Sequence, residues 1–281
     1  MTILVTGGRG RIARTLTRLL HARGVPVRVG TAADPAALDV AEGVGAVHCD
    51  LGDPAGFPAA LDGCSAVFLY AARSHAEAFA DRAAEAGVRH IVLLSSSSVL
   101  APDAEQDALG GHHVRAERAL RASPVLSTFL RPGAFAANAL QWARPIRSTG
   151  AVGLPYPGAH CDPIHESDVA EAALAALTDP DRLGGRAHHL TGPQSLTFRG
   201  QIEQIADVLG RPLGVDTVGR QEWERQNAGH MPAHFAQALL DLWKSADGVP
   251  VPLTRTVEEL TGHPARPFAL WAKEHAADFS A

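Results

Sequence analysis

The chain has 281 residues, a formal net charge of −5 and an apolar fraction of 46%. This length allows one large α/β domain or two intimate ones, and the apolar content suffices for a packed core. The acidic balance argues against nucleic-acid binding, and no apolar run approaches the length of a membrane span. Because Met1 leads directly into a predicted strand, we expect a cytoplasmic protein without a signal peptide.

The first predicted elements are a strand at residues 3–5, a glycine-rich turn and an amphipathic helix. Gly7 can adopt the positive φ that a tight turn requires. Gly10 lacks a Cβ, so a diphosphate can lie against the backbone, and the small Ala13 allows the helix to pack closely on the strand. The helix N-terminus offers free N–H groups to phosphates. The stretch therefore predicts dinucleotide binding, in preference to a glycine turn without a ligand.

A strand–helix alternation follows this motif. Further strands are predicted at residues 25–29, 46–49, 66–70, 90–94 and 126–130, and helices at 74–86, 112–122 and after Asp34-Pro35 and Asp53-Pro54. An aspartate before a proline is typical of a helix cap and first turn. Near-continuous apolar strands that alternate with helices indicate a doubly wound, parallel sheet of the α/β class, with helices on both faces.

The regular alternation ends near residue 138. Prolines interrupt the chain, and the remaining predicted elements are helices at 167–177, 199–209, 232–244 and 267–279 and a strand at 188–191. We predict a dinucleotide-binding domain over residues 1–137. Residues 138–281 are expected to form a smaller, mainly helical substrate lobe above the carboxyl ends of the strands, with segments that return to the sheet.

Several motifs together resemble the atypical, NmrA-like short-chain dehydrogenase/reductases. They are Thr6-Gly7-Gly8-Arg9-Gly10-Arg11-Ile12-Ala13, Asp50-Leu51, the serine run at 95–98, His113-x-x-x-Glu117-x-x-Leu120, Leu130-Arg131-Pro132-Gly133, Asp168-Val169-Ala170 and Leu190-Thr191-Gly192-Pro193. The resemblance implies a Rossmann domain with a small C-terminal lobe. Members of the family include quinone reductases, other NADPH reductases and regulators that bind the cofactor without turning it over.

The resemblance also implies a cofactor site. The diphosphate would lie against the glycine motif, the adenine beside Asp50, and the nicotinamide beside residues 132–135. The predicted cofactor-binding residues are Gly7, Gly8, Arg9, Gly10, Arg11, Ile12, Thr31, Asp50, Leu51, Ala71, Ala72, Ser95, Pro132, Gly133, Ala134 and Phe135. A turn or capping role is the alternative for Asp50.

The residues after the second predicted strand favour NADPH/NADP as the cofactor. An NAD site usually carries an acidic residue there for the ribose hydroxyls. Here no acid follows Val29 until Asp34, which is better explained as a cap. By resemblance, Arg9 and Arg11 would lie near a 2′-phosphate, and the Thr31 hydroxyl can add a donor. Solvated surface arginines are the alternative.

The chain departs from the Tyr-x-x-x-Lys pair that most short-chain dehydrogenases use. Neither Tyr70 nor Tyr156 has a lysine four residues on. At the corresponding helix, His113 and Glu117 share one face, so His113 can donate a proton while Glu117 orients it and raises its pKa. The alternative is a surface histidine and an ion pair from Glu117 to Arg121.

The serine run offers a second catalytic option. Ser95 and Ser97 follow the fifth strand, and the resemblance implies that Ser97 would hydrogen-bond a substrate oxygen. In a third option the enzyme positions hydride against carbonyl, and solvent or substrate supplies the proton. The candidate catalytic residues are therefore Ser95, Ser97, His113 and Glu117. No metal is expected, because the possible ligands His160, Asp162, His165 and Asp168 are interrupted by Pro163 and fit a turn and cap.

We predict an NADPH-dependent reductase of a small molecule that is a monomer or a dimer. Without a strong built-in acid, an already activated acceptor is favoured. The composition is also typical of GC-rich, actinomycete-like genomes, in which aromatic polyketides are common. We therefore expect a ketone on a bulky, polycyclic aromatic, with quinone reduction or cofactor sensing as alternatives. Trp142, Met231, Phe235 and Trp243 are expected to line a pocket or a plain core, with 229–232 as a lid.

Overall fold

The computed structural model describes residues 2–71 and 75–280. Within these residues a seven-stranded, fully parallel sheet runs in the order β3-β2-β1-β4-β5-β6-β9. The strands are β1 (Thr2–Val5), β2 (Val27–Thr31), β3 (Gly45–His48), β4 (Cys64–Tyr70), β5 (His90–Leu94), β6 (Leu126–Pro132) and β9 (Ala187–Leu190). The strand order reverses between β1 and β4, where open α/β sheets bind their ligands. The predicted doubly wound Rossmann sheet is confirmed.

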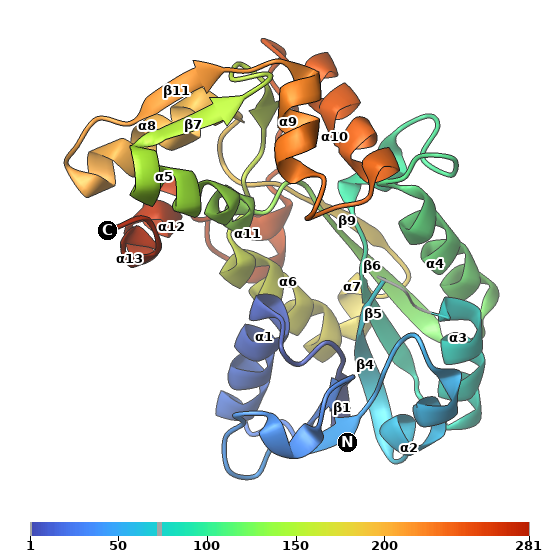
Figure 1. The fold of residues 1–281 in the computed structure, drawn as a ribbon. Helices are drawn as coiled ribbons and strands as arrows, with labels where there is room; N and C mark the ends of the chain where they lie inside the picture. Colours follow the sequence, from blue (N-terminus) through green and yellow to red (C-terminus); the bar gives the residue numbers. More distant parts are fainter. Residues whose placement is uncertain (1, 72–74, 281) are drawn as a thin grey trace.

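Helices cover both faces of this sheet (Figure 1). One face carries α1 (Arg11–Ala22), α6 (Glu166–Thr178), α7 (Pro180–Leu183) and α11 (Thr256–Thr261), and the other carries α2 (Phe57–Leu61), α3 (Ala76–Glu85) and α4 (Gly111–Ala122). Successive strand side chains point to opposite faces, so Ile3 and Val5 join the first apolar cluster while Leu4 joins the second. This burial on both faces explains the near-continuous apolar strands.

The two Asp-Pro pairs begin short 3₁₀ turns, η1 (Pro35–Ala37) and η2 (Pro54–Gly56). Asp34 and Asp53 cap them by accepting N–H bonds at 3.0 Å from residues two positions on. The predicted caps are therefore correct. The prediction of a longer helix after Asp34 is wrong, because η1 ends at Ala37 and the backbone of Leu38 is extended. Two further 3₁₀ segments are η3 (Ser97–Leu100) and η4 (Ala136–Trp142).

The C-terminal lobe is built on a separate apolar cluster, which contains Trp142, Phe198 and Trp271. Its elements are α5 (Ala143–Thr149), β7 (Ala151–Leu154), β8 (His160–Cys161), β10 (Leu196–Thr197), α8 (Phe198–Leu209), β11 (Gly214–Thr217), α9 (Arg220–Asn227), α10 (Ala233–Ser245), α12 (Phe268–Glu274) and α13 (Ala276–Phe279). The small pairs β7–β11 and β8–β10 were not predicted. The helix expected at 267–279 is divided at His275.

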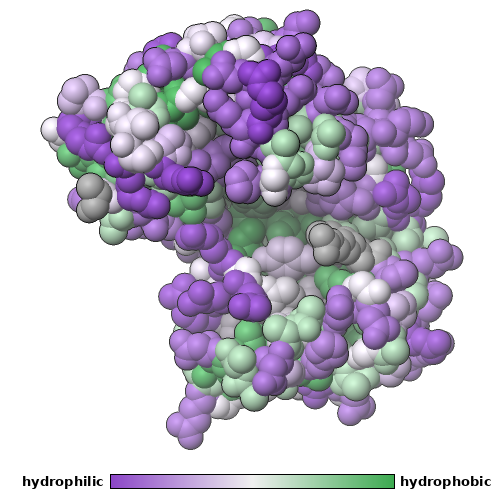
Figure 2. Space-filling view, in the orientation of Figure 1, coloured by the Kyte–Doolittle hydropathy of each residue, from purple (hydrophilic) through white to green (hydrophobic). Residues whose placement is uncertain are grey.

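The two lobes enclose a hollow with a partly apolar floor (Figure 2). The carboxyl ends of the parallel strands face it, and α9 and α10 lie on its other side (Figure 1). Both β9 and α6 belong to the Rossmann unit although they follow residue 138, so the chain returns to the sheet. The boundary between 137 and 138 stays a prediction. No helix in the described residues is long and apolar enough to cross a membrane.

Candidate cofactor and active site

The glycine loop joins β1 to α1 and is held closely against β2. Gly7 has φ +66°, as expected for the tight turn. A Cβ on Gly8 would lie 2.2 Å from Val29 Cγ1, and the Gly8 N–H donates to Gly30 O at 2.9 Å. A side chain at Gly8 would therefore force the loop away from β2.

Tyr70, the last residue of β4, lies directly against this loop. A Cβ on Gly10 would lie 2.9 Å from the Tyr70 hydroxyl, and a Cβ on Gly7 would lie 2.8 Å from its ring. The backbone N–H of Ala13 hydrogen-bonds to this hydroxyl, and burial raises the pKa of Tyr70 to about 12. The two glycines thus make room for Tyr70, which is a reason for them that the sequence analysis missed.

A cavity of about 420 Å³ opens between the glycine loop and the end of β2. Gly7, Arg9, Thr31, Ala32 and Ala33 line it. The Arg9 side chain is exposed and forms no ion pair with any described residue. The Thr31 hydroxyl accepts the Ala33 N–H at 3.1 Å and can still donate its own proton. The cavity therefore offers a guanidinium and a hydroxyl, but no lining carboxylate.

The other expected adenosine contacts are arranged less specifically. Arg11 is exposed at the start of α1, and Ile12 points into the core, so Ile12 can offer only its backbone. Asp50 Oδ1 accepts the Gly52 N–H at 2.8 Å, which is the turn role considered as its alternative. Leu51 is half-buried and its carbonyl accepts the His75 N–H at 3.3 Å. Ala71 is buried, whereas Ala72 lies outside the described residues.

The segment from Pro132 to Phe135 continues from β6 along the edge of the hollow. The Gly133 N–H donates to Leu190 O at 2.9 Å, which ties the segment to β9. The Ala134 carbonyl accepts the Ile164 N–H at 2.8 Å, and Phe135 is half-buried. The segment is thus fixed by neighbouring backbone at the place where the nicotinamide is expected.

Asp162 also contacts this segment, although its sequence context predicted no role for it in the cofactor site. Its carboxylate is buried, and Oδ1 accepts the Ala134 N–H at 3.1 Å. A Cβ on Gly133 would lie only 2.0 Å from Oδ2. Burial raises the pKa of Asp162 to about 6. The only advance signal was an aspartate before a proline, which is equally typical of a turn.

The four serines after β5 differ in their hydrogen bonds. Ser95 is buried and donates to Glu117 Oε1 at 2.7 Å, while Ser96 caps η3 by accepting the Ser98 N–H. The Ser98 hydroxyl contacts Ser96 and the Leu109 carbonyl. Ser97 is half-buried, and its hydroxyl forms no hydrogen bond with the described residues. Among the four, Ser97 therefore has the hydroxyl available to a substrate.

Glu117 is a buried carboxylate held by three side chains. Arg131 donates to both oxygens, at 2.9 and 2.5 Å, and Ser95 and Arg121 complete the set. Although burial alone opposes ionisation, these bonds lower the pKa of Glu117 overall. The expectation that Glu117 orients His113 is wrong, because its oxygens are occupied by Arg131, Ser95 and Arg121. The alternative, an ion pair to Arg121, is confirmed at 3.3 Å.

His113 is neutral in this environment. Burial and the neighbouring His112 outweigh the attraction of Glu117 and lower the pKa of His113 to about 4. Its Nδ1 is buried and unpartnered among the described residues, and its ring lies 3.9 Å from that of His112. The expected rise of this pKa is therefore wrong. A neutral imidazole is a poor proton donor near neutral pH, because the ring must first be protonated.

The other residues considered in the sequence have structural roles: a helix cap, a buried ion pair and apolar packing. His165 caps α6, since its Nδ1 accepts the Ser167 N–H at 3.1 Å. Asp168 is fully buried and bound by Arg266. Trp142, Trp243 and Met231 pack in apolar clusters of the C-terminal lobe, which is the plain-core alternative.

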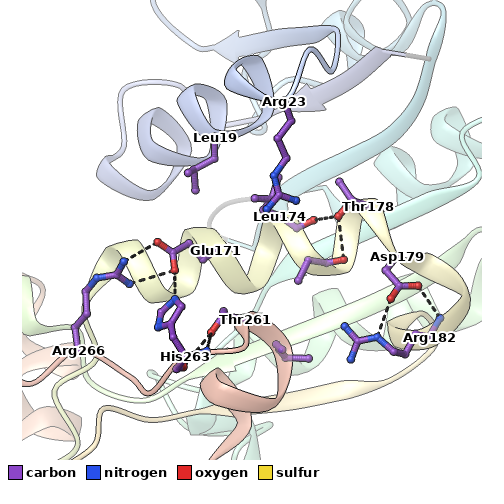
Figure 3. A pocket seen from close by; sticks show the side chains of 12 residues that line it. Leu19, Arg23, Glu171, Leu174, Thr178, Asp179, Arg182, Thr261, His263 and Arg266 are labelled. Carbon is purple, nitrogen blue, oxygen red and sulfur yellow. Dashed lines mark hydrogen bonds and ion pairs between the residues drawn. The ribbon is translucent and has the colours of Figure 1, made fainter.

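A second cavity, of about 550 Å³, lies between α1, α6 and the segment around α11 (Figure 3). Arg266 bridges Asp168 and Glu171 there, and His263 contacts the same Glu171. Ligand atoms of Asp168, Glu171 and His263 lie within 4.8 Å of one another, as a metal site would require. The Arg266 guanidinium already supplies the positive charge to these carboxylates. This cavity is remote from the glycine loop and carries no group of the predicted active site.

These features are those of a Rossmann protein with a dinucleotide-type glycine loop and a hollow between its two lobes. Residues 7–180 match the NAD(P)H-binding family model. The chain belongs to this family. A solved structure of an NmrA mutant shares its fold, with a TM-score of 0.74 at 18% identity, in line with the resemblance of the motifs.

Two curated relatives align over 99% of both chains. A (4-alkanoyl-5-oxo-2,5-dihydrofuran-3-yl)methyl phosphate reductase from Streptomyces griseus is 40% identical over 283 residues. An NAD(P)H azoreductase from Xenophilus azovorans is 32% identical over 288 residues. At this level the expected enzyme class, an NAD(P)H-dependent oxidoreductase, is confirmed.

Solved structures share the fold at lower identity. The Citrobacter triphenylmethane reductase complexed with NADP(H) superposes with a TM-score of 0.80 at 20% identity, covering 98% of this chain and 100% of that one. An Escherichia coli NADPH-dependent quinone oxidoreductase superposes with a TM-score of 0.81 at 21% identity, covering 97% and 99%. Both support the architecture described above.

Proposed function

We propose that the protein uses NADPH to reduce an activated, conjugated small molecule bound in the hollow between the lobes. The adenosine 2′-phosphate would occupy the cavity beside Arg9 and Thr31. The diphosphate would approach the free N–H groups at the start of α1. The nicotinamide would rest against residues 132–135, within reach of the Ser97 hydroxyl.

The state of the polar groups near Ser97 carries this proposal. Glu117 is ionised and occupied by Arg131, His113 is neutral, and Ser95 has its proton committed to Glu117. None of them is a ready acid. An acceptor that delocalises the incoming electron pair needs little help from an acid, so positioning alone can provide much of the rate.

NADPH bound in this site would supply a hydride from C4 of its nicotinamide, which would form a C–H bond on the acceptor and leave NADP⁺. The electron pair of the acceptor double bond moves onto a conjugated oxygen. Ser97 would donate a hydrogen bond to that oxygen, and solvent would later supply the proton. The balance is one hydride and one proton for each two-electron reduction.

A polycyclic aromatic ketone with neighbouring phenols fits this scheme, because its own hydroxyls stabilise the developing alkoxide. A second candidate is an acyl-substituted unsaturated lactone. The Streptomyces griseus relative at 40% identity supports it, since its named substrate is a dihydrofuranone that carries an alkanoyl group and a phosphate. Quinones remain a third class, and the named activities of the relatives favour turnover over cofactor sensing.

The test uses NADPH deuterated at C4 with one member of each class: a polycyclic phenolic ketone, an acyl-dihydrofuranone phosphate and a quinone. Mass spectrometry then locates the label. Deuterium on a carbinol carbon supports the ketone, and deuterium on a ring carbon supports the lactone. Turnover of quinone alone would reject both, and no turnover with any acceptor would reject the reductase proposal.

A further inference from the structure

Three segments meet beside the expected nicotinamide position, and Asp162 lies between them. It follows β8 and precedes α6, and only 8% of its surface is exposed. Its backbone carbonyl accepts the Gly192 N–H at 3.2 Å, just after β9. Its side chain reaches the opposite way, to the residues just after β6. Asp162 therefore connects the carboxyl ends of two sheet strands.

The contact between this carboxylate and residues 133–134 is unusually close. Ala134 donates its N–H to Oδ1 at 3.1 Å. A Cβ on Gly133 would lie 2.0 Å from Oδ2 and 2.3 Å from Oδ1, well inside van der Waals contact. Only glycine therefore fits at position 133 while the carboxylate stays in place. The Ala134 N–H is also committed to Asp162, so it is not available to a cofactor.

No cationic side chain in the described residues forms an ion pair with Asp162. Such a buried, unpaired carboxyl group is costly to keep, and burial accordingly raises its pKa to about 6. The carboxylate accepts the Ala134 N–H and leaves no room for a side chain at Gly133, so it fixes this peptide in one orientation.

We propose that Asp162 is a positioning residue for the nicotinamide ring: it holds the Gly133–Ala134 peptide against which the ring rests. The inference rests on the proposed function, because it takes residues 132–135 as the nicotinamide site. Asp162 contacts the segment and not the reacting atoms. Its loss should therefore alter the nicotinamide half of the cofactor site and spare the adenosine half.

Binding measurements separate these two halves without a substrate. NADPH affinity and the emission of its bound dihydronicotinamide report the whole site, whereas adenosine 2′,5′-bisphosphate reports only the adenosine half. For Asp162→Ala we expect the dissociation constant of NADPH to rise at least fivefold. We also expect that the emission of NADPH no longer changes when it binds. The affinity for adenosine 2′,5′-bisphosphate should stay within twofold of wild type. Asp162→Asn retains an oxygen for the Ala134 N–H and should recover most of the loss.

Gly133→Ala tests the same contact from the other side. The added methyl group would clash with the Asp162 carboxylate, so Gly133→Ala should weaken NADPH binding as Asp162→Ala does. In the Asp162→Ala background the methyl group has room, and adding Gly133→Ala should change little further. If Asp162→Ala fails to fold, Asp162→Asn and Gly133→Ala are compared instead. Gly133→Ala should weaken NADPH binding, whereas Asp162→Asn should retain most of it.

Unchanged NADPH affinity and emission in Asp162→Ala would overturn the proposal. An equal loss for adenosine 2′,5′-bisphosphate would overturn it as well, because the residue would then support the domain as a whole. Failure of the wild-type protein to reduce any acceptor would reject the reductase proposal but not the positioning role of Asp162, since every measurement on Asp162 concerns binding.

Discussion

Arg9 is the residue on which the choice between the two dinucleotides depends. It lines the cavity at the end of β2 and forms no ion pair with a carboxylate in the part of the chain that the structure describes. A charge-assisted hydrogen bond to a 2′-phosphate contributes about 1.5–3 kcal/mol. We therefore expect Arg9→Ala to weaken NADPH roughly tenfold to a hundredfold, and NADH by less than twofold. Titration calorimetry at fixed salt measures both constants.

The matched control is Arg11→Ala. Arg11 is also an exposed arginine of the same loop, but it does not line the cavity. Arg11→Ala should weaken NADPH binding at most a few-fold, because Arg11 contributes only to the general electrostatic field at the helix N-terminus. An equal effect of the two substitutions, or a wild-type preference for NADH, would contradict the assignment of the 2′-phosphate to Arg9.

Ser97 and Ser95 allow a second prediction at this scale. The Ser97 hydroxyl forms no hydrogen bond with the described residues, whereas the Ser95 hydroxyl donates to Glu117, so their alanine variants should have different defects. Ser97→Ala should lower kcat about tenfold and leave both NADPH affinity and thermal stability unchanged. Ser95→Ala should instead lower the melting temperature, because the Glu117 carboxylate loses a donor. Identical kinetic and melting profiles for the two variants would refute this distinction.

At the level of residues, the sequence predicted best the positions at which the backbone conformation restricts the residue type. Gly7 was predictable because a strand–turn–helix junction demands a positive φ. The missing acid after β2 favoured NADP(H), and the resemblance placed Arg9 near the 2′-phosphate; this role of Arg9 stays a prediction. The contacts of Glu117 were not, because Arg131 is fourteen residues away and pairs with it only when β6 lies beside β5. Asp162 was missed for the same reason, since its partners come from another strand.

Among the elements, α4 is fastened to the carboxyl ends of β5 and β6 through one carboxylate. Glu117 lies on α4, Ser95 follows β5, and Arg131 belongs to β6. Removing one partner of a buried ion pair leaves a desolvated charge, which costs about 3–5 kcal/mol. We expect Glu117→Ala to lower the free energy of unfolding by about this amount in urea titrations monitored by circular dichroism.

Arg121→Ala provides the control for this prediction. Arg121 binds the same carboxylate from a half-exposed position, and such pairs contribute about 0–1 kcal/mol. Its loss should therefore change the unfolding free energy by less than 1 kcal/mol. A similar cost for both variants would show that the buried pair with Arg131 does not fasten α4 to the sheet.

Elements with strong local signals were predicted well, and those that depend on distant partners were not. The strand at 90–94 and the helix at 199–209 agree with β5 and α8 within a residue, because one is a continuous apolar run and the other an amphipathic segment. The short strands β7 and β11 have four residues each and pair across about sixty residues of chain. Such a pairing has no local signature, so the C-terminal lobe was predicted as mainly helical, without β7 and β11.

For the whole molecule, His90 gives a dependence of stability on pH. It is buried at the start of β5, where Nε2 contacts Thr128 Oγ1 at 2.8 Å and Nδ1 is unpartnered among the described residues. Burial lowers its pKa to about 4, whereas the unfolded chain titrates near 6.5. Protonation therefore favours unfolding. The contribution of His90 to the free energy of unfolding is complete above pH 6.5. It is lost as the pH falls toward 4, and the total loss is roughly 3 kcal/mol.

The measurement is a series of urea titrations between pH 4.5 and 7.5. His90→Gln keeps a hydrogen-bonding group for Thr128 but cannot titrate, so its stability should fall less steeply with acid than that of the wild type. His230→Gln, at an exposed position, serves as the control and should preserve the wild-type slope. Parallel curves for wild type and His90→Gln would rule out this origin of acid sensitivity.

The tryptophans are distributed unevenly over the two lobes. The chain has four, at positions 142, 223, 243 and 271, and all of them pack in the apolar clusters of the C-terminal lobe. Trp223 and Trp243 contact each other at 5.0 Å between ring centroids. Excitation of indole therefore starts in one lobe, while a bound dihydronicotinamide, which absorbs indole emission, would sit on the other. Energy transfer from tryptophan to NADPH bound in the proposed site would therefore depend on the distance between the two lobes.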